Sequence, residues 1–301
     1  MKYLVTGGCG FIGSNVVDYL ISEGHDVCVI DDLSSDVHDS FYYNNKAKYY
    51  KHSVTDYAMC SDVFRRFKPD YVLHFAAEAR IQNCIADPLK AFKVNYLGTL
   101  TMLELCKKYS IKKLVLSSTS AIYGLNEAPQ HEQTKVNCLN AYSLSKLQAE
   151  ECCKLYSTMY GVDTVCLRYF NVYGPRNPNK GQYAPVIGIF KRQLANNECL
   201  TIVGDGEQTR DFIHVNDVVK ANYQASLFPS FLHGEVFNIG TGKNYTINQI
   251  ACKIQPDKHK HMYLPARIGE ARHTKAICSK AEEVLKWMPT IDLMSWLDNN
   301  K

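Results

Sequence analysis

A run of glycines near the N-terminus constrains the fold of this chain more than any other feature. Residues 2–6 are β-favouring and mostly apolar, which predicts a short buried strand. Gly7, Gly10 and Gly13 follow at once, and a helical pattern covers residues 14–22. In such a strand–turn–helix unit, free backbone N–H groups and the positive end of the helix dipole face a bound pyrophosphate, and glycines let the backbone approach it. The run therefore predicts a dinucleotide-binding site.

The next strand, over residues 25–30, ends in an acidic residue that suits the same kind of site. Asp31 follows Gly7 at close to the roughly 20-residue offset of the acid that binds the ribose of a dinucleotide. A carboxylate accepts a hydrogen bond from a ribose 2′-hydroxyl and repels a 2′-phosphate, so NAD is favoured over NADP. The alternative is a strand-end aspartate that only caps a turn.

Strands then alternate with helices, which predicts an α/β fold with a doubly wound parallel sheet of the Rossmann type. Beyond Asn177 the pattern changes to loops and short elements, which predicts a smaller C-terminal α/β domain for substrate. We expect a dinucleotide-binding domain over residues 1–170, rejoined by about 211–240, and a second domain over 171–301. The further strands are expected at 49–54, 71–76, 113–117, 162–169 and 200–203, and the further helices at 56–67, 89–109, 141–160 and 186–195.

Composition excludes several classes of protein. The 301 residues are 46% apolar, and the net charge of +4 is spread without a long basic block, which disfavours a nucleic-acid partner. No apolar run is long enough to span a membrane. The twelve cysteines lack Cys-x-x-Cys or paired Cys/His spacing, so we expect reduced thiols, no metal site and a cytoplasmic protein without a signal peptide.

A tyrosine and a lysine four residues apart follow a hydroxyl-rich strand end. Thr119 lies at that strand end, and Tyr142 and Lys146 share one face of the next predicted helix. Tyrosine has a pKa of about 10 and is a poor base at neutral pH, but a nearby ammonium and an oxidised nicotinamide favour the phenolate. Tyr142 could then take a proton from a substrate hydroxyl as hydride leaves the carbon, with Thr119 orienting that hydroxyl.

The Tyr-x-x-x-Lys spacing alone decides nothing, because Tyr42/Lys46 and Tyr109/Lys113 also match it. Only Tyr142 opens a long helix shortly after a hydroxyl-rich strand. The alternative is an ordinary pair on a helix surface.

Together these motifs carry a family resemblance over nearly the whole chain. The chain resembles the extended short-chain dehydrogenase/reductase family, in its nucleotide-sugar epimerase/dehydratase branch, and is most similar to UDP-sugar 4-epimerases. The motifs, in chain order, are the glycine turn, Ser118-Thr119, Tyr142-Ser-Leu-Ser-Lys146, Arg168-Tyr-Phe-Asn171, Gly204-Asp-Gly206, Arg210-Asp-Phe and Phe237-Asn-Ile-Gly240.

The resemblance implies which residues hold each ligand. Those expected to bind NAD are Gly7, Gly10, Phe11, Ile12, Gly13, Asp31, Ser53, Val54, Phe75, Ala76, Ala77, Asn95, Tyr142, Lys146, Tyr169 and Phe170. Those expected to bind a UDP-sugar are Ala79, Thr119, Asn171, Val186, Thr201, Val203, Arg210, Arg267, Glu270 and Thr274, with the arginines as charge-assisted donors to the diphosphate. Two alternatives stay open: Arg210 pairs only with Asp211, and Asn171 caps a turn.

The resemblance also bears on the reaction. Dehydratases of this branch carry acid/base residues directly after the threonine, whereas this chain has Ser120 and Ala121, so 4-epimerisation through a transient 4-keto sugar is favoured. Thr274 is small where a tyrosine restricts the sugar pocket in relatives, which favours UDP-N-acetylglucosamine, with UDP-glucose as a second substrate. A uronate 4-epimerase, a nucleotide-keto-sugar reductase and a non-catalytic binding protein remain alternatives. A homodimer through the helices over 89–109 and 141–160 is also implied.

Overall fold

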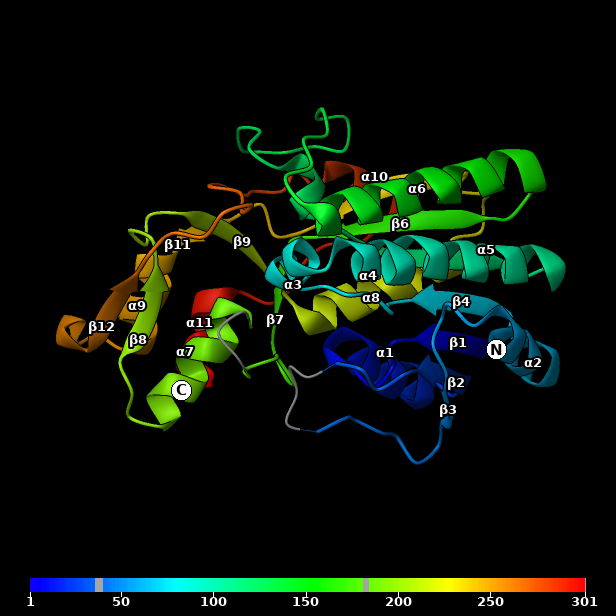
Figure 1. Cartoon of the computed structure of the whole chain (residues 1–301), viewed down its shortest axis with the longest axis horizontal. Coiled ribbons are helices and arrows are strands. Elements are labelled where there is room, and N and C mark those ends of the chain that lie inside the picture. Colours follow the sequence, from blue (N-terminus) through cyan, green and yellow to red (C-terminus); the bar gives the residue numbers. More distant parts are fainter. Residues whose placement is uncertain (36–39, 181–183, 301) are drawn as a thin grey trace.

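The centre of the molecule is one parallel sheet of seven strands (Figure 1). The structure is a computed structural model that describes residues 1–35, 40–180 and 184–300. Every pair of neighbouring strands in this sheet is parallel, and the strand order is that of a Rossmann-type fold. In spatial order the strands are β10 (Glu235–Ile239), β6 (Thr164–Tyr169), β5 (Lys113–Thr119), β4 (Tyr71–His74), β1 (Lys2–Thr6), β2 (Asp26–Asp31) and β3 (Lys48–Lys51).

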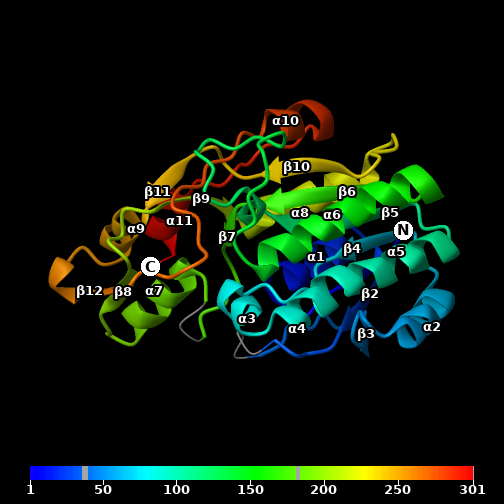
Figure 2. The same cartoon turned by 45° about the horizontal axis from the view of Figure 1, so that its top comes forward.

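Helices cover both faces of the sheet, because successive side chains of each buried strand point to opposite sides. In β1, Tyr3 and Val5 belong to one core and Leu4 belongs to the other. On the first face lie α1 (Phe11–Ser22), α8 (Val215–Leu227) and α10 (Ser279–Leu285). On the second lie α2 (Tyr57–Phe67), α5 (Gly98–Lys108) and α6 (Ala141–Tyr160), and Figure 2 shows α5 and α6 side by side. The predicted fold class is confirmed.

The single helix expected over residues 89–109 is interrupted. It consists of α4 (Pro88–Phe92), a π-helical turn (Lys93–Leu97) and α5, and it follows the short helix α3 (Ile81–Ala86). A π-turn inserts an extra residue and re-aims side chains, and such turns are frequent at functional sites. Here the turn contains Asn95, which is buried.

The remaining elements form a smaller layer beyond the carboxyl ends of the large sheet (Figure 1). Their shared core includes Phe190, Ile202 and Ile250. A mixed sheet has the order β11 (Asn244–Thr246), β9 (Thr209–His214) and β7 (Asn171–Tyr173), and β8 (Leu200–Val203) pairs in parallel with β12 (His261–Leu264). The helices are α7 (Val186–Ala195), α9 (Ile247–Ile254) and α11 (Leu293–Asn299), and a short 3₁₀ turn covers Lys258–Lys260. A second 3₁₀ turn, Ser120–Tyr123, follows β5 and belongs to the large sheet.

The expected domain division remains a prediction, and the packing adds detail to it. β9, within the expected return to the large domain, lies between β7 and β11 in the small mixed sheet, whereas α8 packs on α1 and β10 joins the large sheet. Residues Ala276 and Trp287, expected in the smaller domain, lie in the core of the large sheet. The chain therefore crosses between the two layers several times.

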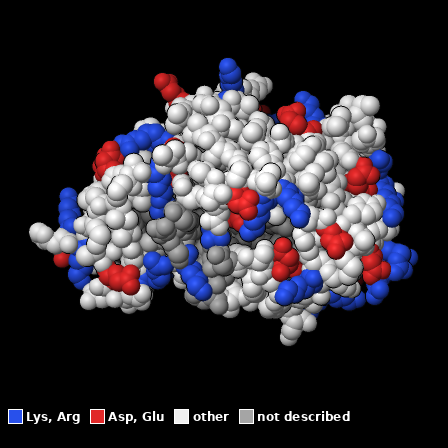
Figure 3. Space-filling view, in the orientation of Figure 1, with Lys and Arg blue, Asp and Glu red and all other residues white. Residues whose placement is uncertain are grey.

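Charge is mixed over the molecular surface. Lysine and arginine side chains are interspersed with aspartate and glutamate on the face shown in Figure 3. Among the described residues, we find no helix with the length and apolar character needed to cross a bilayer.

Candidate active site

One cavity of about 590 Å³ lies where the carboxyl ends of the large sheet meet the smaller layer. Of the residues predicted to bind NAD or substrate, all except Ser53 and Asn95 line it. This position matches the rule that open α/β sheets bind ligands at the carboxyl ends of their strands. The lining comes from both layers, so one ligand site is built from segments far apart in sequence.

The glycine turn forms a tight cradle at one end of this cavity. Gly7 has a φ of +67°, and a Cβ there would lie 2.7 Å from the backbone nitrogen of Ala76. A Cβ on Gly13 would lie 2.2 Å from the carbonyl oxygen of Gly7. Gly10 is the N-cap of α1 and supplies no side chain to cap it, so the helix N-terminus is left to a ligand. The cradle fits a dinucleotide pyrophosphate.

Asp31 ends β2 beside this cradle and lines the cavity. Its carboxylate accepts hydrogen bonds from the backbone N–H groups of Cys9 and Leu33, each at 2.9 Å. Burial raises the pKa of this carboxyl group, while the two N–H groups act to lower it. The side chain is thus fixed next to the glycine turn, where a ribose hydroxyl can be recognised. Both the turn and the acid fit NAD.

The predicted catalytic residues come together on β5 and α6. Thr119 is the last residue of β5, Tyr142 lies in the first turn of α6, and Lys146 follows one turn later. Burial raises the pKa of Tyr142 to about 12, and a hydrogen bond with Thr119 acts to lower it. Burial also lowers the pKa of Lys146 to about 8. The protein alone therefore holds a neutral phenol beside a lysine that is still mainly charged at neutral pH.

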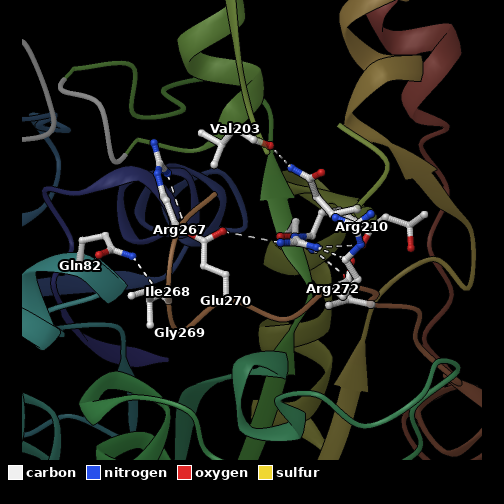
Figure 4. Close-up of polar contacts among 12 residues, drawn as sticks. Gln82, Val203, Arg210, Arg267, Ile268, Gly269, Glu270 and Arg272 are labelled. Atoms are coloured by element: carbon white, nitrogen blue, oxygen red, sulfur yellow. Dashed lines mark hydrogen bonds and ion pairs between the residues drawn. The ribbon is translucent and has the colours of Figure 1, made fainter. Parts of the chain in front are cut away.

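The substrate half of the cavity contains a carboxylate between two arginines. Figure 4 shows Glu270 between Arg267 and Arg210, with N···O distances of 3.8 Å and 3.7 Å. Arg210 also donates to the carbonyl oxygens of Thr209 at 3.0 Å and Arg272 at 3.1 Å. These contacts hold its guanidinium in the cavity wall, where it is available to an anionic ligand.

The structure supports neither of the alternative roles considered for Arg210 and Asn171, which were an ion pair with Asp211 and the capping of a turn. Asp211 does not pair with Arg210, because its carboxylate accepts from the backbone N–H groups of Thr241, Gly242 and Ala276 instead. Asn171 does not cap a turn. Its amide donates to the carbonyl oxygen of Asp211 at 2.9 Å and to the Thr274 hydroxyl at 3.3 Å.

Ser53 and Asn95 lie behind the cavity wall. The Ser53 hydroxyl bonds to the Thr55 hydroxyl at 2.9 Å, and Val54 lines the cavity in its place. Asn95 binds both backbone groups of Glu78: its Oδ1 accepts from the Glu78 N–H at 2.8 Å, and its Nδ2 donates to the Glu78 carbonyl at 3.0 Å. The same Nδ2 donates to Ser145 Oγ at 3.0 Å. Asn95 thus connects the backbone of Glu78, which lines the cavity, to Ser145, the residue before Lys146.

Sequence reasoning missed a buried histidine that continues this network. Thr99 donates to the Asn95 carbonyl at 2.7 Å, so its oxygen must accept from His74 Nε2, which lies 3.1 Å away. His74 Nδ1 then accepts from the Thr6 hydroxyl at 2.6 Å, and Thr6 accepts from the Ala76 N–H at 3.2 Å. Burial lowers the pKa of His74 to about 3, so the ring is neutral. A lone histidine in an apolar strand gives no sequence signal for this role.

Charged and polar groups that were not predicted also line the cavity. Glu78 pairs with Lys90 at 3.2 Å and with Arg80 at 3.7 Å. Gln208 donates from Nε2 to the Val203 carbonyl at 2.7 Å, while its buried Oε1 has no hydrogen-bond partner in the described part of the chain. That oxygen is an acceptor available to a ligand.

Comparison with known proteins identifies the family. Residues 3–240 match the model of the NAD dependent epimerase/dehydratase family. The chain belongs to this family. As an NAD-dependent epimerase/dehydratase, it has the cofactor and the enzyme class that the sequence predicted.

Relatives within the family differ in substrate. The structure of UDP-glucose 4-epimerase from Thermotoga maritima with UDP-glucose is 38% identical, with a TM-score of 0.92 over 99% of this chain and 96% of that one. UDP-N-acetylglucosamine 4-epimerase from Methanobrevibacter ruminantium, in complex with UDP-N-acetylmuramic acid, is 33% identical, with a TM-score of 0.88 over 100% and 99%. UDP-glucuronate 4-epimerase from Thermodesulfobacterium geofontis is 35% identical over 97% of this chain and 92% of its own. The chain is thus of the UDP-hexose 4-epimerase type, and similarity to these relatives does not identify which hexose it uses.

Proposed function

We propose that this protein interconverts the C4 epimers of a UDP-hexose, UDP-N-acetylglucosamine or UDP-glucose or both, using NAD that it retains between turnovers. The observation that carries this proposal is that one cavity is lined both by the predicted catalytic residues and by the predicted ligand-binding groups. The catalytic residues are Thr119, Tyr142 and Lys146, and the binding groups are the glycine cradle, Arg210, Arg267 and Glu270. NAD held by the glycine cradle and Asp31 would supply the hydride chemistry at C4.

The chain's own residues handle the proton and the orientation of the sugar. Tyr142 Oη takes the proton of the C4 hydroxyl as hydride leaves, and gives it back when the keto-sugar is reduced from its other face. Thr119 holds the same hydroxyl in line and favours the phenolate through its hydrogen bond with Tyr142. The ammonium of Lys146 adds positive charge one helical turn away. No second base is needed, because the same proton leaves and returns.

Features of the cavity wall support epimerisation over the other reactions of the family. Ala121 lines the cavity where a dehydratase needs an acid, and an alanine cannot protonate a leaving hydroxyl. Asp31 opposes the 2′-phosphate of NADPH, which a reductase more often uses. The side chains of Ala121 and Asp31 therefore support epimerisation independently of the similarity to known epimerases.

The preference for an N-acetylated sugar rests on Thr274. Its side chain is small, and its hydroxyl accepts from the Asp211 N–H at 3.2 Å and from Asn171, so it is held in the wall instead of entering the cavity as a tyrosine would. The glucuronate-specific relative makes a uronate the second candidate substrate.

The test is an incubation of purified protein with each UDP-sugar and no added cofactor, followed by anion-exchange chromatography. UDP-N-acetylgalactosamine formed from UDP-N-acetylglucosamine would support the whole proposal. Conversion of UDP-glucose alone would contradict the Thr274 argument and retain the mechanism. Conversion of UDP-glucuronate alone would replace the substrate, and no conversion of any sugar would contradict the proposed function.

We also propose a homodimer that pairs the α5 and α6 faces of two copies. Leu144, Leu155 and Met159 form an exposed apolar stripe along α6, and Leu97 lies exposed where α5 begins. The exposed fractions of Leu155 and Met159 are 51% and 66%, which is costly for apolar side chains clustered on one face unless a partner covers them.

A further inference from the structure

Residues 265–273, here called the strap, follow β12 and lead toward α10, crossing from the smaller layer to the large one. Arg267 and Glu270, which we expect to hold the substrate, both lie on it. No residue of the strap is buried, and Ile268 is 87% exposed. Apolar packing therefore contributes little to its position, which depends on polar contacts.

On the side of the smaller layer, the strap is held by several such contacts. The Thr209 N–H and the Arg210 guanidinium both donate to the carbonyl of Arg272, at 3.1 Å each. Arg272 in turn makes two bonds to the Asp205 carboxylate, at 2.9 Å and 2.7 Å. This end of the strap is anchored to β9 and to the turn after β8.

On the side of the large layer, two amide side chains bind consecutive carbonyl groups of the strap. Gln82 Nε2, on α3, donates to the Ile268 carbonyl at 3.2 Å, as Figure 4 shows. Asn140 Nδ2 donates to the Gly269 carbonyl at 2.9 Å. Gly269 has a φ of +83°, a conformation that L-residues rarely adopt, so the bend that presents its carbonyl depends on glycine. These two bonds lie between Arg267 and Glu270 in sequence.

Asn140 also begins the helix that carries Tyr142. Its Oδ1 accepts from the Ser143 N–H at 2.9 Å and so caps α6. Asparagine, aspartate and serine cap helices about equally well. Of these, only asparagine adds an amide donor while its oxygen caps the helix. The residue type at this position is thus explained by the strap as well as by the cap.

We propose that Asn140 is a positioning residue that ties the substrate-binding strap to the N-terminus of the catalytic helix, with Gln82 as the second tie. The inference rests on the proposed function for its ligand, a UDP-sugar. The two ties hold Arg267 and Glu270 over the same cavity into which Tyr142 faces. When they are broken, the strap loses two hydrogen bonds to the large layer while the catalytic residues keep their positions.

The test distinguishes the hydrogen bond from Asn140 to the strap from the capping of α6 by the same residue. Asn140→Ser keeps a good N-cap but is too short to reach Gly269, and Gln82→Leu removes the other tie. For each variant we expect UDP to bind roughly three- to tenfold more weakly by calorimetry on the NAD-loaded protein, the worth of one hydrogen bond. We also expect faster hydrogen exchange at residues 265–273 in the protein without UDP, with an unchanged melting temperature. Asp56→Ser, a cap exchange on α2, is the matched control and should change neither readout.

Two results would overturn the proposal. One is wild-type UDP affinity and wild-type strap exchange both in Asn140→Ser and in the variant that combines Asn140→Ser with Gln82→Leu. The other is a lower melting temperature for Asn140→Ser with no faster exchange in the strap, which is the behaviour of a cap alone. Neither readout requires turnover. If no sugar is epimerised but strap exchange responds as expected, the proposed function fails and the tie stands.

Discussion

Under the proposed function, Tyr142 has to act as a base although burial favours its neutral phenol. In the protein alone its pKa is raised to about 12 by burial, so a phenolate is rare at neutral pH. Thr119 is the group of this chain that acts against that rise. The phenol is therefore neutral in the protein alone, and under the proposed function the positive charge of an oxidised nicotinamide would favour the phenolate.

Replacing this phenol should strongly slow turnover and leave the fold intact. Tyr142→Phe removes the group that moves the proton, so we expect kcat to fall roughly 10²- to 10⁴-fold, while the NAD content and the melting temperature stay close to wild type. Turnover by chromatography and NAD release on denaturation measure the two effects. Tyr109→Phe is the control, because Tyr109 also lies four residues before a lysine but bonds to Ser61 away from the cavity. An active Tyr142→Phe enzyme would favour a non-catalytic role for the tyrosine.

Lys146 should make the stability of the NAD-free protein depend on pH. Burial lowers its pKa from 10.5 to about 8, so between these values the unfolded chain binds more protons and stability rises with pH. Below pH 8 the buried charge costs up to about 3 kcal/mol. Lys146→Met removes that cost, and its gain in unfolding free energy over wild type should be largest at pH 7 and smaller at pH 9.5.

Urea unfolding at the two pH values measures this gain. Lys154→Met, at an exposed position of the same helix, is the control and should show no such change. An equal gain for Lys146→Met at both pH values would show that the lysine's charge is not responsible.

At the scale of elements, the glycine turn between β1 and α1 has no room for an added side chain at Gly13. A Cβ on Gly13 would lie 2.2 Å from the Gly7 carbonyl oxygen, so Gly13→Ala forces the strand and the helix apart. We expect a loss of roughly 3 kcal/mol in unfolding free energy and a purified protein depleted of NAD. Gly24→Ala is the matched control, because Gly24 has a φ of +76° but an added Cβ there would meet no atom within 4 Å. We expect this variant to lose about 1–2 kcal/mol of unfolding free energy and to keep its NAD.

Elements with local signals could be predicted from the sequence to the residue. The helix α6 has an asparagine cap at its start and Gly161 at its end, and α7 follows Pro185, so both were predicted with the bounds that the structure gives. The strand β12 could not be predicted, because its pairing with β8 joins segments about sixty residues apart. The π-turn was missed for the same reason, since its inward-facing Asn95 finds its partners at Glu78 and Ser145.

The site shows the same division between local and distant signals. The glycine turn, Asp31 and the pair of Tyr142 and Lys146 follow from motifs and their order along the chain. The binding residues of the smaller layer came from resemblance, and the cavity brings them to the same place. His74 and the second bond of Asn140 were not predicted, because each depends on a partner that only the fold brings near.

At the scale of the whole molecule, the cavity depends on a chain that crosses between two layers. The large sheet supplies the glycine turn and Tyr142, and the smaller layer supplies Arg210, so both are needed to form the lining of the cavity. The exposed stripe on α6 lies on the second face of the sheet, outside this cavity. Assembly through that stripe would support α6 without covering the site.

The proposed dimer gives the last prediction. Leu155 and Met159 lie one turn apart on α6, so Leu155→Glu combined with Met159→Glu puts two negative charges on the proposed interface of each copy, where burial without a partner charge is costly. We expect light scattering to give the mass of a dimer for wild type and of a monomer for the variant. Met262→Glu, on β12 at an exposed fraction of 49%, is the control and should remain dimeric. A monomeric wild-type protein would rule out the assembly, and a dimeric double variant would move the interface to another face.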